Sequence, residues 1–506
     1  MSDFFIGVDC GTQSTKAIIV HGNTGKVMGE ASAAYGMIAD LPQGAQEQKP
    51  SVWVSAMERS IRAALKKSGI AAAKVRGMGV SAQQHGFVAL DDKDQVIRPA
   101  KLWCDTSTAQ EAHYLLNKLG GLGSVINMGG NGLPVGFTAS KILWMKRKEP
   151  KNFTKLATVL LPHDYLNFYL TKKKTMEAGD ASGTGIFDTK TRDWHPQLVE
   201  AIDVDLSTAL PTIQQSSQPA GLLEAKVARK LGLPEGIIVS AGGGDNMMSA
   251  IGTGNTRPGV VTLSLGTSGT LYGYSSRPII DPLGQVAAFC DSTGAWLPLI
   301  CTMNATRATE LVRNLFKMSH EKMTQEAMKA PPGSQGLVLL PYFEGERIPD
   351  LPQASGVFFG MNSQNFTSAH LARATMEGVT MGLNYGLSRL RDLGLRPKEI
   401  RLTGGGSNNP LWRQMVADIF ETDVIGLATT QGAAFGAALQ AKWCYSLSQG
   451  EKVRIQQLTD QFVKTDPKTK CSPIKANFKA YRPLQEFYNE LSRTSAPLFD
   501  RATSLR

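Results

Sequence analysis

The stretch FFIGVDCGTQSTKAIIV at residues 4–20 carries the strongest fold signal in the chain. Two apolar, β-rich runs flank a turn of small residues, a pattern typical of a β-hairpin. The same plan returns as VTLSLGTSGTL at residues 261–271. Strand and helix patterns alternate after each hairpin. The sequence therefore predicts two α/β lobes of similar design, at residues 1–250 and 251–506.

Composition excludes several classes of protein. The 506 residues are 42% hydrophobic, so a large core is available. The six cysteines form no C-x-x-C pair, which argues against a disulfide scaffold and a thiolate zinc site and fits a reducing cytoplasm. No apolar run approaches the ~20 residues that cross a bilayer. The first run lies between Asp3 and Asp9 and lacks a basic region before it. We therefore expect a cytoplasmic protein without membrane contact.

The net charge of +11 is spread along the chain. Its densest stretches, residues 146–148 and 172–174, lack the interleaved aromatic residues of a nucleic-acid-binding surface. We expect no nucleic acid partner. A general positive field would still help to attract an anionic co-substrate.

The turn of the first hairpin is suited to phosphate. A turn of small residues leaves backbone N–H groups facing one way, and hydroxyl and ammonium groups add donors. The expected phosphate contacts are Gly11, Thr12, Gln13, Ser14, Thr15 and Lys16. Asp9 would repel a nucleotide unless a cation intervened, which predicts Mg²⁺ near Asp9, held directly or through water. The alternative is a plain β-turn beside an exposed Asp.

Two later turns extend this pattern. One lies in the second hairpin, and the other follows the strand-like run 400–402 and precedes an amphipathic run at 411–420. Their glycines permit close approach of a phosphate or a flat ligand. The predicted nucleotide contacts here are Gly266, Thr267, Gly404, Gly405, Gly406 and Asn409.

The segment GGGDN at residues 242–246 follows an apolar strand pattern. The glycines clear space into which Asp245 would project, where its carboxylate can accept a proton from a hydroxyl group, and Asn246 can orient the same molecule. The alternative is that Asp245 only caps a helix starting at Met247. We prefer the catalytic reading because a cap requires no preceding glycines.

Donors and acceptors suited to a polyol occur in two more places. Gln84 and His85 follow the strand-like run 75–80, and Trp103 places an aromatic face two residues before Asp105. With Asn246, these four residues are the predicted sugar contacts. A structural histidine and a buried tryptophan with a turn aspartate are the alternatives.

Two long motifs then show a family resemblance. GFTASKILWM at residues 136–145, and GVFFGM at 356–361 continuing to HLARATME at 370–377, resemble the two sequence patterns of the FGGY carbohydrate kinases. The first pattern departs from the family at Lys148, where an amide, His or Glu is usual. The resemblance covers nearly the whole chain. Within the family it is closest to the members that phosphorylate D-xylulose.

The resemblance implies an α/β, two-lobed, actin-like (ribonuclease H-like) fold in which ATP and sugar meet in an interlobe cleft. It implies that Asp245 is the catalytic base and that Asp9 works with Mg²⁺. The turns at Gly11-Thr12 and Gly266-Thr267 match the phosphate loops, and residues 404–406 match the adenosine loop. Dimers are common among the relatives, so a homodimer is one expectation, although the sequence alone leaves the oligomeric state open.

The implied reaction is ATP-dependent phosphorylation of D-xylulose, a ketopentose, at its terminal hydroxyl to give xylulose 5-phosphate. Three departures leave the sugar open to ribulose, another ketose or a polyol: Gln84 replaces Met, Cys104 replaces Asn, and Asp291 stands where His is common. Glycerol is disfavoured because an Arg-Glu-Thr triplet is absent at residues 84–86. The alternatives of other classes are an actin-like ATPase without a sugar substrate and a catalytically silent sugar sensor.

Overall fold

The computed structural model describes residues 3–428, 432–503 and 505. Its contacts divide the chain into two compact units. The first unit comprises Met1–Arg257, Tyr274–Pro298 and Gln431–Val463, and the second comprises Pro258–Gly273, Leu299–Thr430 and Lys464–Arg506. The predicted division near residue 250 differs from this one because two later segments return to the first unit.

The first unit is built on a mixed sheet with the strand order β13-β14-β5-β1-β2-β3, and β15 also pairs with β5. The predicted hairpin at residues 4–20 is confirmed, since β1 and β2 are antiparallel and Asp9 lies opposite Lys16. β5 runs parallel to β1 on its other side. The strands are β1 (Phe4–Cys10), β2 (Ser14–His21), β3 (Val27–Ala34), β5 (Val75–Ala82), β13 (Pro219–Leu222), β14 (Ile238–Ser240) and β15 (Gly243–Gly244).

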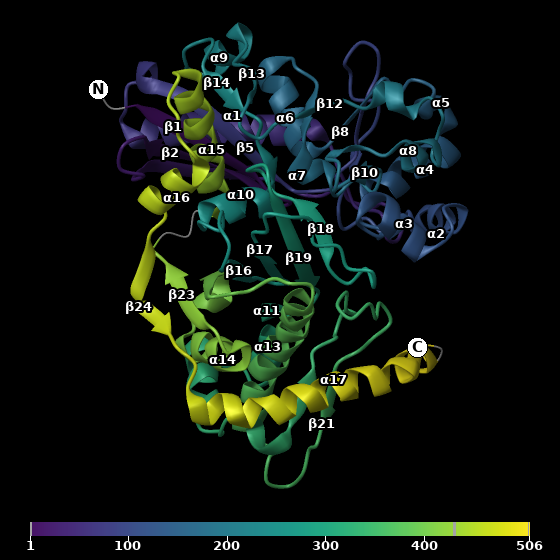
Figure 1. Ribbon diagram of the computed structural model, residues 1–506, viewed down its shortest axis with the longest axis vertical. Helices are drawn as coiled ribbons and strands as arrows, with labels where there is room; N and C mark the ends of the chain where they lie inside the picture. Colours follow the sequence, from purple (N-terminus) through teal and green to yellow (C-terminus); the bar gives the residue numbers. More distant parts are fainter. Residues whose placement is uncertain (1–2, 429–431, 504, 506) are drawn as a thin grey trace. The chain divides into compact units, whose positions relative to one another are not determined.

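Glycines on the sheet explain why the segment after residue 431 returns to the first unit. Helix α15 (Gly432–Ser448) packs on β1, β5 and α10 (Asp245–Gly252), as Figure 1 shows. A Cβ atom on Gly7 would lie 1.8 Å from the Ala434 carbonyl oxygen, and one on Gly79 would lie 2.2 Å from that of Ala437. The helix therefore lies directly on the strand backbones, with no side chain between.

The first unit also contains further helices and short strands. Helix α1 (Pro50–Ser68) contains the amphipathic run predicted from residue 52 and packs on β2 and β3. The remaining elements are β4 (Glu47–Gln48), η1 (Ala72–Lys74), β6 (Val88–Leu90), β7 (Ala100–Lys101), α2 (Ala109–Lys118), α3 (Leu122–Gly129), α4 (Thr138–Lys148), α5 (Pro150–Phe153), β8 (Thr158–Leu160), α6 (Pro162–Thr171), β9 (Thr175–Glu177), α7 (Ala178–Ala181), β10 (Phe187–Asp188), β11 (Asp193–Trp194), α8 (Pro196–Glu200), η2 (Leu206–Ala209), β12 (Thr212–Gln214), α9 (Ala225–Leu231), β18 (Ala287–Cys290) and α16 (Ile455–Phe462).

The second large sheet has the order β18-β19-β17-β16-β22-β23-β24, and its strands from β17 to β24 in that order belong to the second unit. The second predicted hairpin is confirmed, because β16 and β17 are antiparallel. The elements are β16 (Val260–Leu265), β17 (Gly269–Gly273), β19 (Trp296–Thr302), α11 (Thr306–Leu315), α12 (His320–Ala327), η3 (Ser334–Gly336), β20 (Val338–Leu340), β21 (Val357–Phe359), α13 (Ser368–Asp392), β22 (Glu399–Thr403), η4 (Gly405–Asn408), α14 (Pro410–Phe420), β23 (Asp423–Leu427), β24 (Thr465–Cys471) and α17 (Lys475–Thr503).

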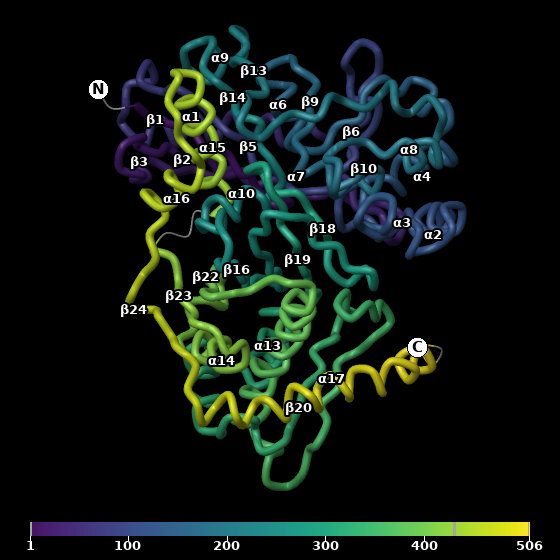
Figure 2. Tube along the Cα trace, in the orientation of Figure 1, coloured from purple at the N-terminus to yellow at the C-terminus, as the bar shows by residue number. Residues whose placement is uncertain are grey.

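Two long helices close the second unit. The amphipathic run predicted at 371–390 lies inside α13, and the closing helix predicted near 483–493 lies inside the longer α17. Figure 2 traces α17 past α13 and α14, both of which it contacts. Pro483 is inside α17 and does not begin it.

Glu377, in the second family motif, helps to hold these helices together. The Glu377 carboxylate accepts hydrogen bonds from Ser334 Oγ, Arg373 Nε and Tyr481 Oη. It also accepts one from the Gly333 amide at 3.0 Å. A buried carboxylate with this many donors ties the loop before β20 to α13 and α17, so this motif residue is structural. Among the residues that the structure describes, no helix has both the length and the apolar composition that a membrane span requires.

Candidate active site

Parallel strands bring the two predicted catalytic carboxylates to one edge of the first sheet. Asp9 pairs in register with Ser81 at the end of β5, and Ser81 in turn pairs with Gly243 in β15. Asp245 follows at once, as the first residue of α10. Ser81 Oγ donates a 3.0 Å hydrogen bond to Asp9 Oδ1. Ligand sites of open α/β sheets lie at such strand ends.

The electrostatics of this edge suit proton transfer. Burial and the neighbouring charge of Asp9 raise the pKa of Asp245 to about 7. Burial also raises the pKa of Asp9, although the Ser81 hydrogen bond and Lys16 oppose that shift. A carboxylate whose pKa lies near neutrality can accept a proton from an alcohol and release it later. The raised pKa of Asp245 is compatible with the general-base role that the sequence predicts for it.

The first glycine of the GGGDN motif has a structural explanation. Gly242 has a φ of +72°, and a Cβ atom there would lie 2.5 Å from the Val80 carbonyl oxygen. Gln440 in α15 accepts a hydrogen bond from the Gly242 amide at 2.8 Å and donates one to its carbonyl at 3.1 Å. The N-cap of α10 is Gly244, with no side-chain hydrogen bond, so Asp245 is not the cap of this helix.

Gln84 and Asn246, both predicted sugar contacts, are neighbours. Asn246 Nδ2 donates to Gln84 Oε1 at 3.0 Å and to Asp245 Oδ1 at 3.2 Å. The two amides and the carboxylate thus form one hydrogen-bonded row. Such a row presents both donors and acceptors, which is what hydroxyl groups of a sugar require.

His85 is held in an unusual conformation. Its φ is +62°, in the left-handed region that side chains rarely adopt. Its carbonyl oxygen accepts hydrogen bonds from Lys141 Nζ at 2.7 Å and Thr138 Oγ1 at 3.2 Å. The ring packs against Phe137, with centroids 4.7 Å apart. The first family motif therefore fixes His85, and Lys141 has this role although the sequence analysis assigned it none.

The carbonyl groups of the first predicted phosphate turn accept hydrogen bonds from other parts of the protein. The Gly11 carbonyl accepts a bond from Tyr35 Oη at 2.6 Å, and the Thr12 carbonyl accepts one from Gln48 Nε2 at 2.7 Å. The Gln13 carbonyl accepts a bond from the Tyr35 amide at 3.0 Å. The Gly11 amide donates to the Ser14 carbonyl at 3.0 Å, so the groups that the turn could offer to a phosphate are its other amides.

The second unit repeats this arrangement. The Gly266 carbonyl accepts a bond from the Thr306 amide at 2.9 Å, and the Thr267 carbonyl accepts one from Ala305 at 3.0 Å. The start of α11 thereby holds this turn as Tyr35 and Gln48 hold the first. Thr267 itself is exposed.

The glycine run at 404–406 follows β22 in the second unit. Gly404 has a φ of +82°, and a Cβ atom there would meet the Leu265 backbone at 2.6 Å. A Cβ atom on Gly406 would meet the Leu265 side chain at 2.8 Å. At Gly405 nothing lies within 4 Å of that position, so this glycine faces open space that a ligand could fill.

Four predicted contact residues have structural partners. Thr15 is fully buried and its hydroxyl lies 3.2 Å from Tyr35 Oη. Trp103 Nε1 donates to Thr12 Oγ1 at 3.0 Å. Asp105 is fully buried, and its carboxylate accepts bonds from Lys101 Nζ, Ser107 and the Gln46 amide. Asn409 caps α14 by accepting bonds from the amides of residues 411 and 412. We leave Thr15, Asp105 and Asn409 out of the ligand contacts proposed below.

The donor set around Asp9 fits a magnesium ion shared with a nucleotide. Among the described residues no group of three or more His, Cys, Asp or Glu side chains could hold a metal ion. Mg²⁺ is usually held by one or two carboxylates together with water and substrate phosphates, and does not need an all-protein cage. Asp9, beside the turn that the sequence predicts to bind phosphate, meets that requirement.

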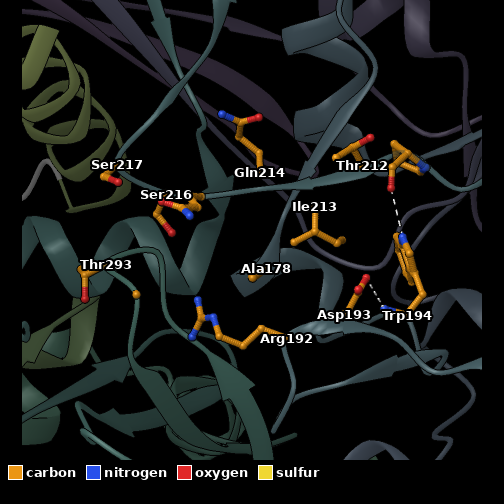
Figure 3. Close-up of a pocket in the computed structure, with 13 residues that line it drawn as sticks. Ala178, Arg192, Asp193, Trp194, Thr212, Ile213, Gln214, Ser216, Ser217 and Thr293 are labelled. Carbon is orange, nitrogen blue, oxygen red and sulfur yellow. Dashed lines mark hydrogen bonds between the residues drawn. The ribbon is translucent and has the colours of Figure 1, made fainter.

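A separate cavity of about 560 Å³ opens in the first unit beside α7, and it contains none of the predicted site residues. Figure 3 shows the Arg192 side chain extending toward the Ser216 and Thr293 side, with Trp194 on the other side. Arg192 Nη1 donates to the Ala295 carbonyl at 2.7 Å. The residues that line this cavity do not include Asp9 or Asp245.

Two α/β units with repeated glycine turns, and a buried carboxylate whose pKa is raised to about 7, are the features of a phosphotransferase of the actin-like ATPase fold. The chain belongs to the FGGY family of carbohydrate kinases. Residues 4–252 match its N-terminal domain and residues 261–445 its C-terminal domain.

The similar proteins named below are sugar kinases, which agrees with the family match. The chain is 41% identical to a xylulose kinase of Haemophilus influenzae over 490 residues, covering 96% of this chain and 98% of the relative. It is 32% identical to one from Escherichia coli, covering 98% and 99%. Among solved structures, a ligand-bound xylulose kinase from Lactobacillus acidophilus superposes with a TM-score of 0.92 at 25% identity, covering 99% of each chain.

Proposed function

We propose that the protein transfers the γ-phosphoryl group of ATP to the terminal hydroxyl of D-xylulose, giving xylulose 5-phosphate. The observation that carries the proposal is the Asp9–Asp245 edge, where a carboxylate with a pKa of about 7 lies next to the Asn246–Gln84 pair. The named relatives support xylulose as the sugar.

In this reaction Asp245 accepts the proton of the sugar hydroxyl as that oxygen attacks the γ-phosphorus. Asn246, Gln84 and His85 hold the ketopentose so that the hydroxyl faces Asp245. The amides of the first turn other than that of Gly11, which donates to the Ser14 carbonyl, bind phosphate oxygens, as do those of the Gly266-Thr267 turn in the second unit. Phosphoryl transfer depends mainly on such positioning and charge stabilisation.

Asp9 is the residue that we propose to hold Mg²⁺, directly or through water. The ion would neutralise charge on the transferring phosphoryl group. Burial raises the pKa of Asp9, and the hydrogen bond from Ser81 and the charge of Lys16 offset part of that shift.

A panel of sugars tests the proposal. ADP release would be measured with D-xylulose, D-ribulose, xylitol and glycerol at matched concentrations, and with ATP alone. We expect the highest kcat/KM for D-xylulose. A higher value for another ketose or polyol would move the assignment to that substrate. ATP turnover at the same rate without sugar would indicate an actin-like ATPase instead.

The proposal also includes a cytoplasmic location and leaves open whether the chain works as a homodimer. Sedimentation velocity of the purified protein would measure its oligomeric state directly.

A further inference from the structure

A buried ionic pair lies behind the sugar-binding amides and has no role in the chemistry described so far. His163 in α6 and Asp180 in α7 are both 0% exposed. His163 Nδ1 donates to Asp180 Oδ2 at 2.6 Å. On the other side of the ring, His163 Nε2 lies 3.0 Å from Asp164 Oδ1. The ring is therefore enclosed between two carboxylates.

Neighbouring charges and burial act on the pKa of His163 in opposite directions. Burial by itself would lower the pKa of His163, but Asp164 and Asp180 together raise it well above its ordinary value. Glu177, the other buried acid close by, has its pKa raised to about 7 by burial, with Ser216 and Arg192 opposing that shift. The two carboxylates therefore favour the protonated form of His163, whose positive charge balances a negative charge on Asp180 in an interior where an isolated charge is costly.

The second oxygen of Asp180 reaches the sugar site. Gln84 Nε2 donates to Asp180 Oδ1 at 3.5 Å, and Gln84 Oε1 accepts the hydrogen bond from Asn246 Nδ2. A glutamine amide has a donor end and an acceptor end, and a carboxylate can only accept. Asp180 therefore determines that the oxygen of Gln84, and not its nitrogen, faces Asn246.

This orientation matters for the next residue. With Gln84 Oε1 and Asp245 Oδ1 both accepting from Asn246 Nδ2, the two protons of that nitrogen are engaged. The carbonyl end of Asn246 is then the part turned toward other donors, such as sugar hydroxyls. If Gln84 rotated by half a turn, two amide nitrogens would face each other and this arrangement would be lost.

We propose that His163 and Asp180 are positioning residues for the sugar: the buried pair fixes the rotamer of Gln84 and, through it, the hydrogen-bonding direction of Asn246. The pair contacts no substrate. This proposal rests on the proposed sugar-kinase function and adds to it the residues that set sugar affinity.

Steady-state kinetics of His163→Leu and Asp180→Asn test it. His163→Leu removes the cation and its N–H, and Asp180→Asn removes the charge that selects the rotamer of Gln84. We expect KM for the sugar to rise about 10-fold in each, comparable to the loss of one buried hydrogen bond. KM for ATP should stay within twofold of the wild type. His163→Gln, which keeps an N–H donor, should recover most of the sugar affinity.

A matched control separates positioning from general damage to the fold. Asp281 is equally buried, and its carboxylate accepts hydrogen bonds from the amides of Leu283 and Gln285 in a loop. Asp281→Asn should lower the melting temperature while leaving the sugar KM unchanged. A rise in sugar KM that matches that of Asp180→Asn would overturn the proposal.

A double-mutant cycle gives an independent readout. Gln84→Met removes the amide that the pair is proposed to orient, so adding His163→Leu to it should raise the sugar KM no further. Additive effects, or an unchanged KM in folded Asp180→Asn, would contradict the proposal. If wild-type protein turned over a sugar other than D-xylulose, only the substrate assignment would fail, and the variants would be compared on that sugar.

Discussion

Asp9, near the end of β1, and Asp245, directly after β15, lie on either side of β5, the strand that pairs with both, and burial together with the charge of Asp9 raises the pKa of Asp245 to about 7. The parallel pairing of β1, β5 and β15 creates this relationship, since it places residues far apart in sequence at one sheet edge. A carboxylate pair that resists double ionisation binds a proton or a cation readily. A kinase that uses a general base and a divalent ion needs both proton binding and cation binding.

Replacing Asp245 with Asn should reduce kcat by about 10²–10⁴-fold, the usual effect of losing a general base. Sugar and nucleotide binding, measured by isothermal titration calorimetry, should remain because the amide keeps the size of the side chain. Near-wild-type turnover by a folded Asp245→Asn protein would remove Asp245 from this role.

The same variant should be more stable than the wild type at alkaline pH. The raised pKa means that the folded protein binds the Asp245 proton more tightly than the unfolded chain does. The stability from that proton is therefore lost as pH rises between the ordinary value of 3.8 and about 7. Without Mg²⁺ or nucleotide, we expect Asp245→Asn to raise the melting temperature by on the order of 2 °C more at pH 8 than at pH 5. An equal shift in melting temperature at both pH values would contradict the raised pKa of Asp245.

Replacing Asp9 with Asn should weaken activity in a way that added Mg²⁺ partly restores. The amide keeps the hydrogen bond with Ser81 but binds a hard cation less well than a carboxylate does. Initial rates would be measured from micromolar to tens of millimolar Mg²⁺. A loss of activity that is the same at every concentration would count against a metal-binding role.

Gly405→Ala tests the glycine run of the second unit. Its added methyl group meets no atom of the protein within 4 Å, so the melting temperature should stay unchanged. If the adenosine lies on this run, the methyl should raise KM for ATP several-fold and leave KM for the sugar unaltered. An unchanged KM for ATP would place the nucleotide elsewhere.

Gly7→Ala tests the packing of α15 on the sheet. The new Cβ atom would lie 1.8 Å from the Ala434 carbonyl, so the helix or the strand must shift. Overpacking of this kind typically costs about 1–3 kcal/mol of unfolding free energy. The control is Gly123→Ala in α3, where nothing lies within 4 Å and alanine should stabilise the helix by up to ~1 kcal/mol. Denaturant unfolding would measure both.

Much of the fold could be predicted from local patterns. The two hairpins, α1, α13 and the α/β class follow from periodicity and turn residues, because those signals lie in adjacent residues. The extent of α17 was underestimated, since Pro483 was expected to begin the helix and in fact lies inside it. The return of α15 to the first unit has no local signal, as it depends on Gly7 and Gly79 facing a distant helix.

The candidate site likewise has features that the sequence predicts and features that only the structure shows. Residue type and spacing predicted site roles for four residues whose chemistry is visible in the sequence, namely Asp9, Asp245, Gln84 and Asn246. The sequence could not reveal that Asp105 is enclosed by Lys101 and Ser107, or that Asn409 caps α14. Those roles are set by neighbours that only folding supplies.

The sequence by itself determined which groups can bind phosphate, accept a proton and contact a polyol, because these capacities belong to side chains and to short turns. The tertiary structure alone decided that His163 and Asp180 lie behind Gln84, and that Asp245 has a pKa near neutrality. The physical reason is that burial and the approach of distant charges arise only when separate strands and helices pack together.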